Sequence, residues 1–446
     1  MNIYECKVRN NRLIVVFAKR YVYHYGCLVT EVEKTVLRLI LMVFAPLLSL
    51  LLFTLGSGFL TTLLTIRLHL QGGSSWVVGF LTAAYYAGLV LGSFVIGRTT
   101  KRVGHIRVYA ASAAILSVAI LLQGLIAVDW FWILLRFITG AFTAALYVAI
   151  ESWMLVVSPP ERRGQMLSLY MIVFYAALAL GQFLLNINNI SSVIPFCIVV
   201  LFCSLSIFPI TITHATSPKF EDIAPLSLIK IFRISPSGML ACLAAGLITS
   251  VVYGVLPLFA GENGLSSAFT AQIMSATIFG AMAIQYPLGK LSDWIERRKV
   301  LIICSLVSCF LAVLLMFMTH HHELFLFCAF MFGGFSFIIY PLGINHTCDF
   351  LDGDNLVAVT QGLLLANGIG SIVGPLIVPS MMHLFGPLGI FAYFAIITFA
   401  LGIFFYWRRS ITSPTPIEEQ HEFVAATRTT SLTSSLVSKD QQALHS

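Results

Sequence analysis

Apolar residues occur along this chain in runs of roughly 20, separated by short polar segments. A helix of about 20 apolar residues is long enough to cross the hydrocarbon core of a lipid bilayer. The pattern therefore predicts an all-α membrane protein with about twelve spanning helices, at approximately residues 40–66, 75–97, 108–127, 131–156, 165–187, 192–213, 237–260, 268–289, 300–318, 323–345, 357–381 and 386–407.

One short motif appears twice, half a chain apart, and each copy lies between two apolar runs. The first copy runs from Gly97 to Arg107 and the second from Gly289 to Lys299. Both are basic, both contain glycine, and each follows the second span of its half. Many membrane transporters are built from two related halves, so the repeat predicts two pseudo-symmetric six-helix bundles.

The spans and the polar segments between them predict five regions. The first is a cytoplasmic N-terminal extension, or else an over-extended gene start. The last is a disordered tail, because it is rich in Ser, Thr and Gln and poor in large apolar residues. The predicted regions are the extension 1–38, the N-terminal bundle 39–213, a cytoplasmic linker 214–234, the C-terminal bundle 235–407 and the tail 408–446.

Composition strengthens the membrane prediction, and the placement of charge orients it. The chain is 58% hydrophobic and only 10% charged, whereas a soluble domain is about 25% charged. The basic residues fall in the termini and on one side of the spans, with Arg67 and Arg136 as the exceptions. Because cytoplasmic loops carry the excess of Lys and Arg, both termini are predicted to be cytoplasmic, and nucleic acid is not a predicted partner.

The fourth span contains a polar stripe on an otherwise apolar helix. Steps of three or four residues keep its members on one helix face. A charge facing lipid costs several kcal/mol, so the stripe should face a wet cavity or a polar partner. Its members are Arg136, Thr139, Thr143, Tyr147 and Glu151.

Two interpretations of Arg136 remain open at this point. The arginine could bind a polar or anionic group of a solute, or take part in proton coupling. It could instead pair with a carbonyl or a carboxylate and only hold the fold. Other polar residues inside spans, including Tyr175 and Gln285, suggest a cavity of hydroxyl and amide groups. The predicted substrate or coupling cavity comprises Arg136, Thr139, Thr143, Tyr147, Tyr253, Tyr340 and Asn367.

Glu151 is too far along its helix from Arg136, about 22 Å at 1.5 Å per residue, to pair with it. Its candidate partners are Arg102, His105 and Arg107 in the first motif copy. Such a pair would hold the cytoplasmic side closed, although a simple structural ion pair fits equally well. The predicted cytoplasmic gate comprises Gly97, Arg102, Gly104, His105, Arg107, Glu151, Gly289, Asp293, Arg297 and Arg298.

His346 and Asp349 lie three residues apart near the inner end of the tenth span. A His–Asp pair can relay protons, but such a pair more often caps a helix end, and both interpretations are kept. Tyr340 and Pro341 precede them, and the proline should kink or break this helix.

Small residues four apart in two spans mark predicted close contacts between helices. They are Ala84, Gly88 and Gly92 in the second span, and Gly362, Ala366, Gly370 and Gly374 in the eleventh. The nine cysteines show no metal-ligand spacing, and the chain has no Walker sequence or catalytic constellation. The chain is therefore predicted not to be an enzyme, and neither a cofactor nor a metal site is predicted.

The two motif copies resemble the signature loops of the major facilitator superfamily, which join helices 2–3 and 8–9. The second copy keeps Gly289, Asp293, Arg297 and Arg298, but has Glu296 at the family's second glycine. The first copy has Lys101 in place of the family's aspartate. In the family that aspartate helps to lock the inward side, so the departure puts a locking role of the first copy in doubt.

A more local resemblance is to the YcaD-like branch of bacterial inner-membrane members. The matching segments are Val103–Arg107, Ile150–Trp153, Arg162–Gly164 with Leu169–Met171, Tyr340–Leu342 with His346 and Asp349, and Gly370–Pro375. The resemblance implies twelve helices, alternating access around a central site lined by helices 1, 4, 7 and 10, and secondary transport that is often proton-coupled. Family members often carry an arginine near position 136, where it helps proton coupling or substrate binding.

Taken together, the residues and the resemblance predict a monomeric secondary transporter of a small organic solute in the bacterial inner membrane. Its partners would be the solute, a coupling proton and the bilayer. A sensor or scaffold built on a transporter fold is the alternative, with the long tail as its signalling element.

Overall fold

The computed structural model describes residues 43–158, 163–187, 189–212, 227–351 and 356–411, together with Gln420 and Phe423. The predicted N-terminal extension, most of the predicted linker and most of the predicted tail lie outside these residues. Within the described part of the chain all regular structure is helical, as the sequence predicts.

Eleven apolar stretches among the described residues are long enough to cross a membrane. The last, Ala358–Ile411, contains two helices, so each of the twelve predicted spans has a helical counterpart. After a first helix, Val43–Leu70, the elements are α2 (Ser75–Val103), α3 (His105–Leu125), α4 (Asp129–Val157), α5 (Arg163–Gln182), η2 (Phe183–Asn186), α6 (Ile194–Leu205), α7 (Ile207–Ile212), α8 (Leu228–Ile234), α9 (Pro236–Gly254), α10 (Leu256–Glu262), α11 (Ser267–Trp294), α12 (Arg297–Phe317), α13 (His322–Phe337), α14 (Ile339–Cys348), α15 (Leu356–Phe385), η4 (Gly386–Leu388) and α16 (Gly389–Ile411).

Among the described residues, three predicted spans are each divided into two α-helices, and a proline follows each of these divisions. α6 gives way to α7 ahead of Pro209, α9 to α10 ahead of Pro257, and α13 to α14 ahead of Pro341. Proline lacks the N–H that would donate to the carbonyl four residues earlier, and its ring clashes with that carbonyl. The predicted break in the tenth span is therefore confirmed, and it falls at Ile338.

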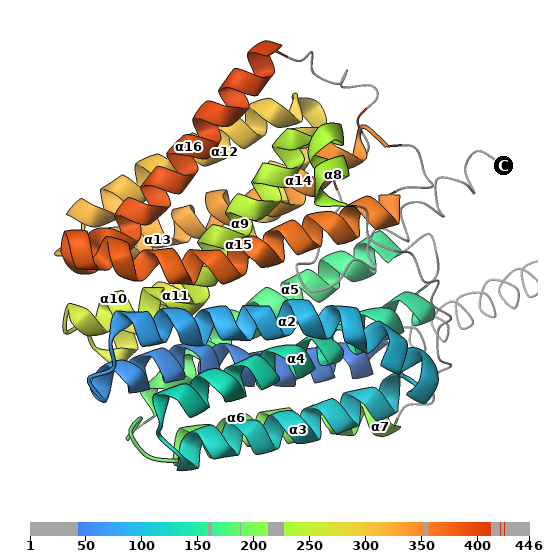
Figure 1. Ribbon diagram of the computed structural model, residues 1–446, viewed down its shortest axis with the longest axis vertical. Coiled ribbons are helices and arrows are strands. Elements are labelled where there is room, and N and C mark those ends of the chain that lie inside the picture. Colours follow the sequence, from blue (N-terminus) through green and yellow to red (C-terminus); the bar gives the residue numbers. More distant parts are fainter. Residues whose placement is uncertain are drawn as a thin grey trace, which may run out of the picture. The chain divides into compact units, whose positions relative to one another are not determined.

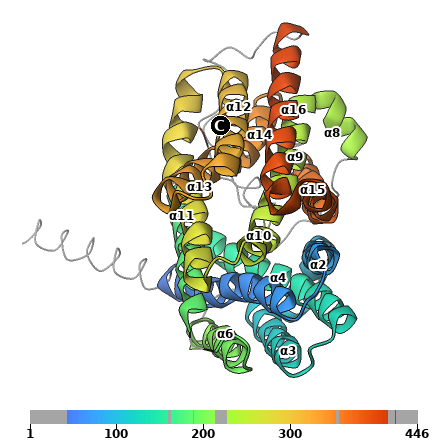
Figure 2. The ribbon, with the colours of Figure 1, turned by 90° about the vertical axis from the view of Figure 1, so that its left-hand side faces the viewer.

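The helix packing repeats between the first and second halves of the chain. α2 packs against α4 and α3 against α6, as α11 packs against α13 and α12 against α16 (Figures 1 and 2). Among the described elements, the most extensive contacts between the halves are those of α2 with α15 and of α5 with α11. This repeat supports the predicted division into two six-helix bundles, whose boundaries stay a prediction.

Glycines allow the closest of these approaches. A side chain on Gly88 of α2 would collide with the Phe137 carbonyl of α4, and one on Gly140 of α4 would collide with the Tyr85 carbonyl of α2. The small-residue stripe predicted in the second span thus lies at a helix interface.

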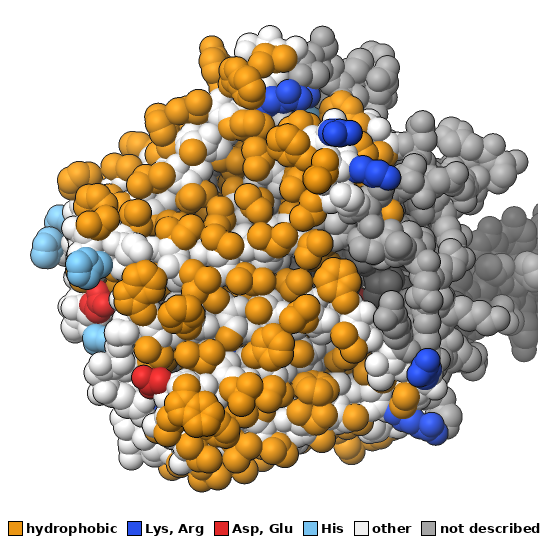
Figure 3. Space-filling model, viewed as in Figure 1, with side chains coloured by type: hydrophobic (Ala, Val, Ile, Leu, Met, Phe, Trp, Pro, Cys, Tyr) orange, Lys and Arg blue, Asp and Glu red, His pale blue; other side chains and the backbone are white. Residues whose placement is uncertain are grey.

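On the face shown in Figure 3, apolar side chains cover the middle, Lys and Arg lie toward one end, and His, Asp and Glu lie at the other. Large apolar side chains such as Trp130, Phe310 and Phe317 are 65–70% exposed, as expected for helices that face lipid. One end, the basic end, carries the exposed residues Arg102, Arg107, Lys230, Lys299 and Arg409. The other, the histidine end, carries Asp129, Glu262, His320, His321 and His322.

Candidate functional site

Arg136 lies deep within α4 and is 2% exposed. Its guanidinium carbon lies 4.2 Å from the centroid of the Tyr85 ring of α2. Its Nη2 donates to the Thr61 hydroxyl of the first helix at 3.3 Å. Arginine favours aromatic faces because the ring quadrupole attracts the cation. The buried charge is thus stabilised by a ring and a hydroxyl.

One N–H donor of the Arg136 guanidinium makes no hydrogen bond to the described residues. Within the described part of the chain Arg136 Nε has no hydrogen-bond partner, and a buried unmade hydrogen bond is costly. Such a group is available to a solute, a water or a proton-exchanging partner.

Arg136 opens onto a small cavity together with Thr139 and Thr143 of the predicted stripe. The cavity lies among the first helix, α2, α3, α4 and α6, which all belong to the first half. Three residues of the predicted seven-residue cavity therefore lie together. The remaining lining residues are Phe53, Ser57, Leu60, Tyr85, Leu116, Ile120, Val199 and Cys203.

The other four predicted cavity residues make packing contacts elsewhere. The Tyr147 ring lies edge-on between Phe53 and Phe174, with centroids 5.5 and 5.6 Å away. The amide nitrogen of Asn367 donates to the Cys242 carbonyl at 3.0 Å and ties α15 to α9. Tyr340 is fully buried in the core of the second half, and Tyr253 packs edge-on against Phe337. Their role in a solute site stays a prediction.

Sequence analysis missed the partners of Arg136, namely Thr61 and Tyr85, and the cavity-lining residue Ser57. A signal for two of them was present, since Ser57, Thr61 and Thr65 follow one another at four-residue steps on the first helix. This spacing places three hydroxyls on one helix face. Nothing in the spacing of Tyr85 distinguishes it from Tyr86 beside it.

The two halves touch at the histidine end. Thr65 of the first helix donates to the Gly254 carbonyl at the end of α9 at 2.7 Å. A side chain on Gly254 would collide with Thr82 of α2, and one on Gly261 would lie 2.7 Å from the His69 ring. The described structure is therefore closed between these elements at this end.

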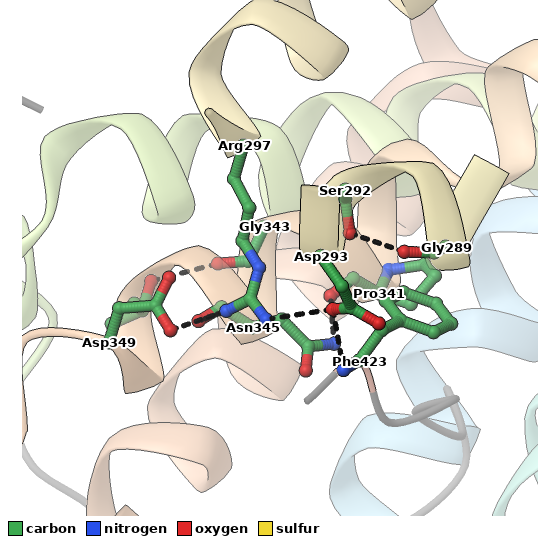
Figure 4. A network of polar contacts seen from close by, with 10 residues as sticks. Gly289, Ser292, Asp293, Arg297, Pro341, Gly343, Asn345, Asp349 and Phe423 are labelled. Atoms are coloured by element: carbon green, nitrogen blue, oxygen red, sulfur yellow. Dashed lines mark hydrogen bonds and ion pairs between the residues drawn. The ribbon is translucent and has the colours of Figure 1, made fainter. Parts of the chain in front are cut away.

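At the basic end the second motif copy forms a buried ionic network (Figure 4). Arg297, at the start of α12, pairs with the Asp349 carboxylate and donates to the Asn345 carbonyl at 3.0 Å. It also lies 3.5 Å from Asp293 Oδ1 at the end of α11. Arg297 and Asp349 are each 1% exposed, so the network ties the α11–α12 turn to the end of α14.

Glu296 occupies the motif position at which the first copy has Gly104, and it has defined ionic partners. Its Oε2 accepts from Arg409 Nε of α16 at 3.2 Å and lies 3.6 Å from Lys299 Nζ. In the first copy Gly104 has a positive φ of 91°, whereas Glu296 has a φ of −49°. The second turn does not require glycine, because its backbone is in a region open to any residue.

The first motif copy lies at the turn between α2 and α3, with Gly97 inside α2 and His105 at the start of α3. Arg102 and Arg107 are exposed, whereas Glu151 is 4% and His105 6% exposed. The predicted pairing of Glu151 with this copy stays a prediction. At the second copy, Arg298 is 3% exposed.

His346 is 4% exposed, with its ring edge-on to Phe350 at 5.1 Å. Its predicted partner Asp349 ends α14 and binds Arg297. The relay and the cap both stay predictions. Among the described residues no three His, Cys, Asp or Glu side chains are grouped to hold a metal ion.

The described residues form an all-helical membrane fold with repeated halves and a buried arginine beside a small cavity of mixed apolar and hydroxyl lining, as expected of a membrane transporter built from two related halves. The chain belongs to the Major Facilitator Superfamily, whose family profile matches residues 46–294 and 238–443.

Curated relatives include the uncharacterized MFS-type transporter YcaD of Escherichia coli O45:K1, which is 28% identical over 355 residues, 79% of this chain and 91% of the relative. YcaD of Escherichia fergusonii is 27% identical over 75% of this chain and 87% of the relative.

Solved structures confirm the fold. The nucleoside transporter NupG matches with a TM-score of 0.66 and 14% identity, over 82% of this chain and 98% of its own. A D-xylose-proton symporter matches with a TM-score of 0.68 and 13% identity, over 82% and 97%.

Proposed function

We propose that this chain is a secondary active transporter that moves a small organic solute across the bacterial inner membrane by alternating access. The observation that carries the proposal is Arg136, a fully buried cation that keeps a donor unpaired beside a cavity. An arginine at this depth in a membrane helix is costly, and a functional role explains why the cost is tolerated.

The lining of the cavity suggests the chemistry of the solute. Ser57, Thr139 and Thr143 offer hydroxyls, and Arg136 offers one positive charge. This combination suits a neutral, hydroxyl-rich solute or one with a single negative charge. The named substrates of the two similar structures, a nucleoside and D-xylose with a proton, fit that class and supply the first compounds to test.

The coupled ion in this proposal is a proton, and the transporter is a monomer. Arg136 would act either by binding the solute directly or by biasing a nearby protonation step. The amide and hydroxyl groups of Tyr253, Tyr340 and Asn367 would complete the solute site from the second half after a rearrangement.

Orientation and gating follow from the two charged ends. The basic end would face the cytoplasm, because Lys and Arg are retained on that side, and both termini would lie there. The contacts at the histidine end would then close the outer side, and the two motif copies would close the inner side. Gly97, Arg102 and Glu151 in the first half and Gly289, Asp293, Arg297 and Arg298 in the second would form that inner gate.

The test combines binding with transport. Thermal unfolding of the purified protein is measured with nucleosides, pentoses and monocarboxylates, for the wild type, Arg136→Ala and the control Arg233→Ala. Arg233 is exposed on α8, so its loss removes a charge without touching the cavity. Each stabilising compound is then tested for uptake into proteoliposomes with and without a proton gradient.

We expect a compound that stabilises the wild type and Arg233→Ala, with uptake reduced at least tenfold in Arg136→Ala at equal insertion. Uptake at the wild-type rate by well-inserted Arg136→Ala would contradict the role of this residue. A compound that binds but is never transported would favour the sensor alternative.

A further inference from the structure

Tyr85 of α2 lies against α4 close to the point at which Arg136 leaves that helix. The Tyr85 carbonyl comes so near to Gly140 that a side chain at position 140 would collide with its oxygen. Gly140 follows Arg136 by four residues, so both lie on the same face of α4. The absence of a side chain at position 140 therefore lets the α2 backbone approach closely enough for the Tyr85 ring to reach the arginine.

The Tyr85 ring covers the cation itself. The guanidinium carbon of Arg136 lies 4.2 Å from the ring centroid, well inside the range of about 6 Å over which a ring face attracts a cation. The planar guanidinium stacks on such a face, so the contact fixes the plane of the group as well as its position. The hydrogen bond from Arg136 Nη2 to Thr61 is long, at 3.3 Å. The orientation of the guanidinium therefore depends largely on the ring.

The hydroxyl group of Tyr85 holds the ring in place. It lies within hydrogen-bonding reach of Thr143 of α4 and of Ser57 of the first helix. Both of these residues line the cavity, as do Tyr85 and Arg136. A phenol hydroxyl donates one hydrogen bond and also accepts, so it can bond to two hydroxyls at once. The ring cannot swing away from Arg136 without breaking these contacts.

An aromatic partner differs from a carboxylate in what it leaves behind. The ion pairs among the described residues belong to Arg297, Lys299 and Arg409, each of which faces an acidic side chain that cancels its charge. The Tyr85 ring orients the Arg136 guanidinium without cancelling its charge, and Arg136 Nε keeps a donor that no described residue accepts. The arrangement therefore holds a cation in a fixed direction and leaves it able to act.

We propose that Tyr85 is the positioning residue of the Arg136 site. Its ring fixes the guanidinium beside the cavity, and its hydroxyl fixes the ring to the first helix and α4. Tyr85 acts through Arg136 and need not touch the solute or the coupled proton. This role in transport rests on the proposed function, whereas the contact between the ring and the guanidinium does not.

The first experiment tests the contact alone, with the full-length protein in detergent and its arginines labelled with ¹⁵N. Protons above an aromatic face resonate upfield because of the ring current, and the Nε–H signal of Arg136 is identified by its loss in Arg136→Lys. We expect this signal upfield of those of exposed arginines in the wild type. It should return toward them in Tyr85→Leu and stay upfield in Tyr85→Phe, which keeps the ring.

Tyr286→Leu is the control for loss of a tyrosine ring, because Tyr286 is 68% exposed on α11, and it should leave the Arg136 signal unchanged. The midpoint of thermal unfolding is measured for each variant to show that it is folded. An Arg136 signal that is not upfield in the wild type, or that does not move in folded Tyr85→Leu, would overturn the positioning contact.

The second experiment tests the role in transport. Uptake of uridine, D-xylose and lactate into proteoliposomes is measured over a range of concentrations, so that KM and the maximal rate are obtained separately. For a compound that the wild type transports, we expect the ratio of maximal rate to KM to fall at least fivefold in Tyr85→Leu. Tyr85→Phe should recover at least threefold of that loss. Because Tyr85 acts through Arg136, Tyr85→Leu should change the same parameter that Arg136→Lys changes.

The outcomes separate positioning from packing and from the transport proposal. Uptake by Tyr85→Leu at the wild-type ratio would overturn the role of Tyr85. A change in the other parameter, or equal losses in Tyr85→Phe and Tyr85→Leu, would show that Tyr85 acts apart from Arg136 and would also overturn it. If the wild type transports none of the three compounds, the proposed function fails for these solutes and the transport role of Tyr85 fails with it, whereas the Arg136 signal still decides the contact.

Discussion

Two buried arginines show how the same residue type is stabilised in different ways. Arg297 is surrounded by acceptors, with Asp293, Asp349 and the Asn345 carbonyl within reach of its guanidinium. Arg136 has a ring face and one hydroxyl. A buried cation held by carboxylates ties elements together, whereas one held by a ring face and a hydroxyl keeps a charge that a solute or a coupled group can meet. This contrast is the reason that we propose a solute or coupling role for Arg136, whereas Arg297 holds the α11–α12 turn to the end of α14 within the proposed inner gate.

The pairing of Arg297 makes a prediction about stability. Arg297→Ala should lower the free energy of unfolding by about 3–5 kcal/mol, because it leaves the Asp349 charge buried without its cation. The midpoint of SDS denaturation measures the loss.

Lys299→Ala is the control on the same helical turn. The Lys299 side chain is 48% exposed, and an exposed ion pair contributes at most about 1 kcal/mol. Equal losses for the two variants would mean that the buried Arg297 contacts stabilise the fold no more than the exposed Lys299–Glu296 ion pair does.

At the scale of helices, close backbone approach determines which elements pair. α2 and α4 approach through Gly88 and Gly140, and α9 and α15 through Gly246 and Gly370. In a bilayer, lipid supplies no hydrophobic drive for helix association, so van der Waals contact between small residues matters more. The stripes at four-residue steps made these interfaces predictable. The partner of each stripe could not be predicted, because any flat helix face would fit a glycine.

A single methyl group at such an interface should therefore be destabilising. Gly88→Ala should cost about 1–3 kcal/mol, because the new side chain must push the Phe137 carbonyl away. Thermal unfolding in detergent measures the effect against Gly164→Ala, for which we expect no loss. A Gly88→Ala protein as stable as the wild type would mean that α2 and α4 lie further apart than described.

At the scale of the whole molecule, the contacts between halves define the state that is described. Thr65, Gly254 and Thr82 meet at the histidine end although they come from three helices in two halves. Alternating access requires such contacts to be weak enough to break, and neutral hydrogen bonds such as those of Thr65 and Ser275, together with glycine packing, meet that requirement.

Loss of the Thr65 hydroxyl should shift the balance between states. A hydrogen bond contributes about 1 kcal/mol net, so Thr65→Val should raise the open fraction by about fivefold. Faster maleimide labelling of a Thr82→Cys reporter measures this shift.

Thr99→Val is the matched control, because the Thr99 hydroxyl is exposed and bonds only within its own helix. If both variants were labelled at the wild-type rate, the Thr65 contact would not contribute to closure.

The sequence by itself determined the helical membrane fold and the repeated halves, and it singled out Arg136 as a charge within a spanning helix. Those features depend on local properties: the length of apolar runs, the spacing of small residues, and the cost of a charge in a bilayer. Only the tertiary structure decided which residues surround Arg136, because Tyr85 and Thr61 reach it from other helices. It also decided that Arg297 binds Asp349, and that Phe423 returns to Gly289 across 134 positions of sequence. Contacts between distant segments depend on how helices pack, and no local pattern in the sequence records that packing.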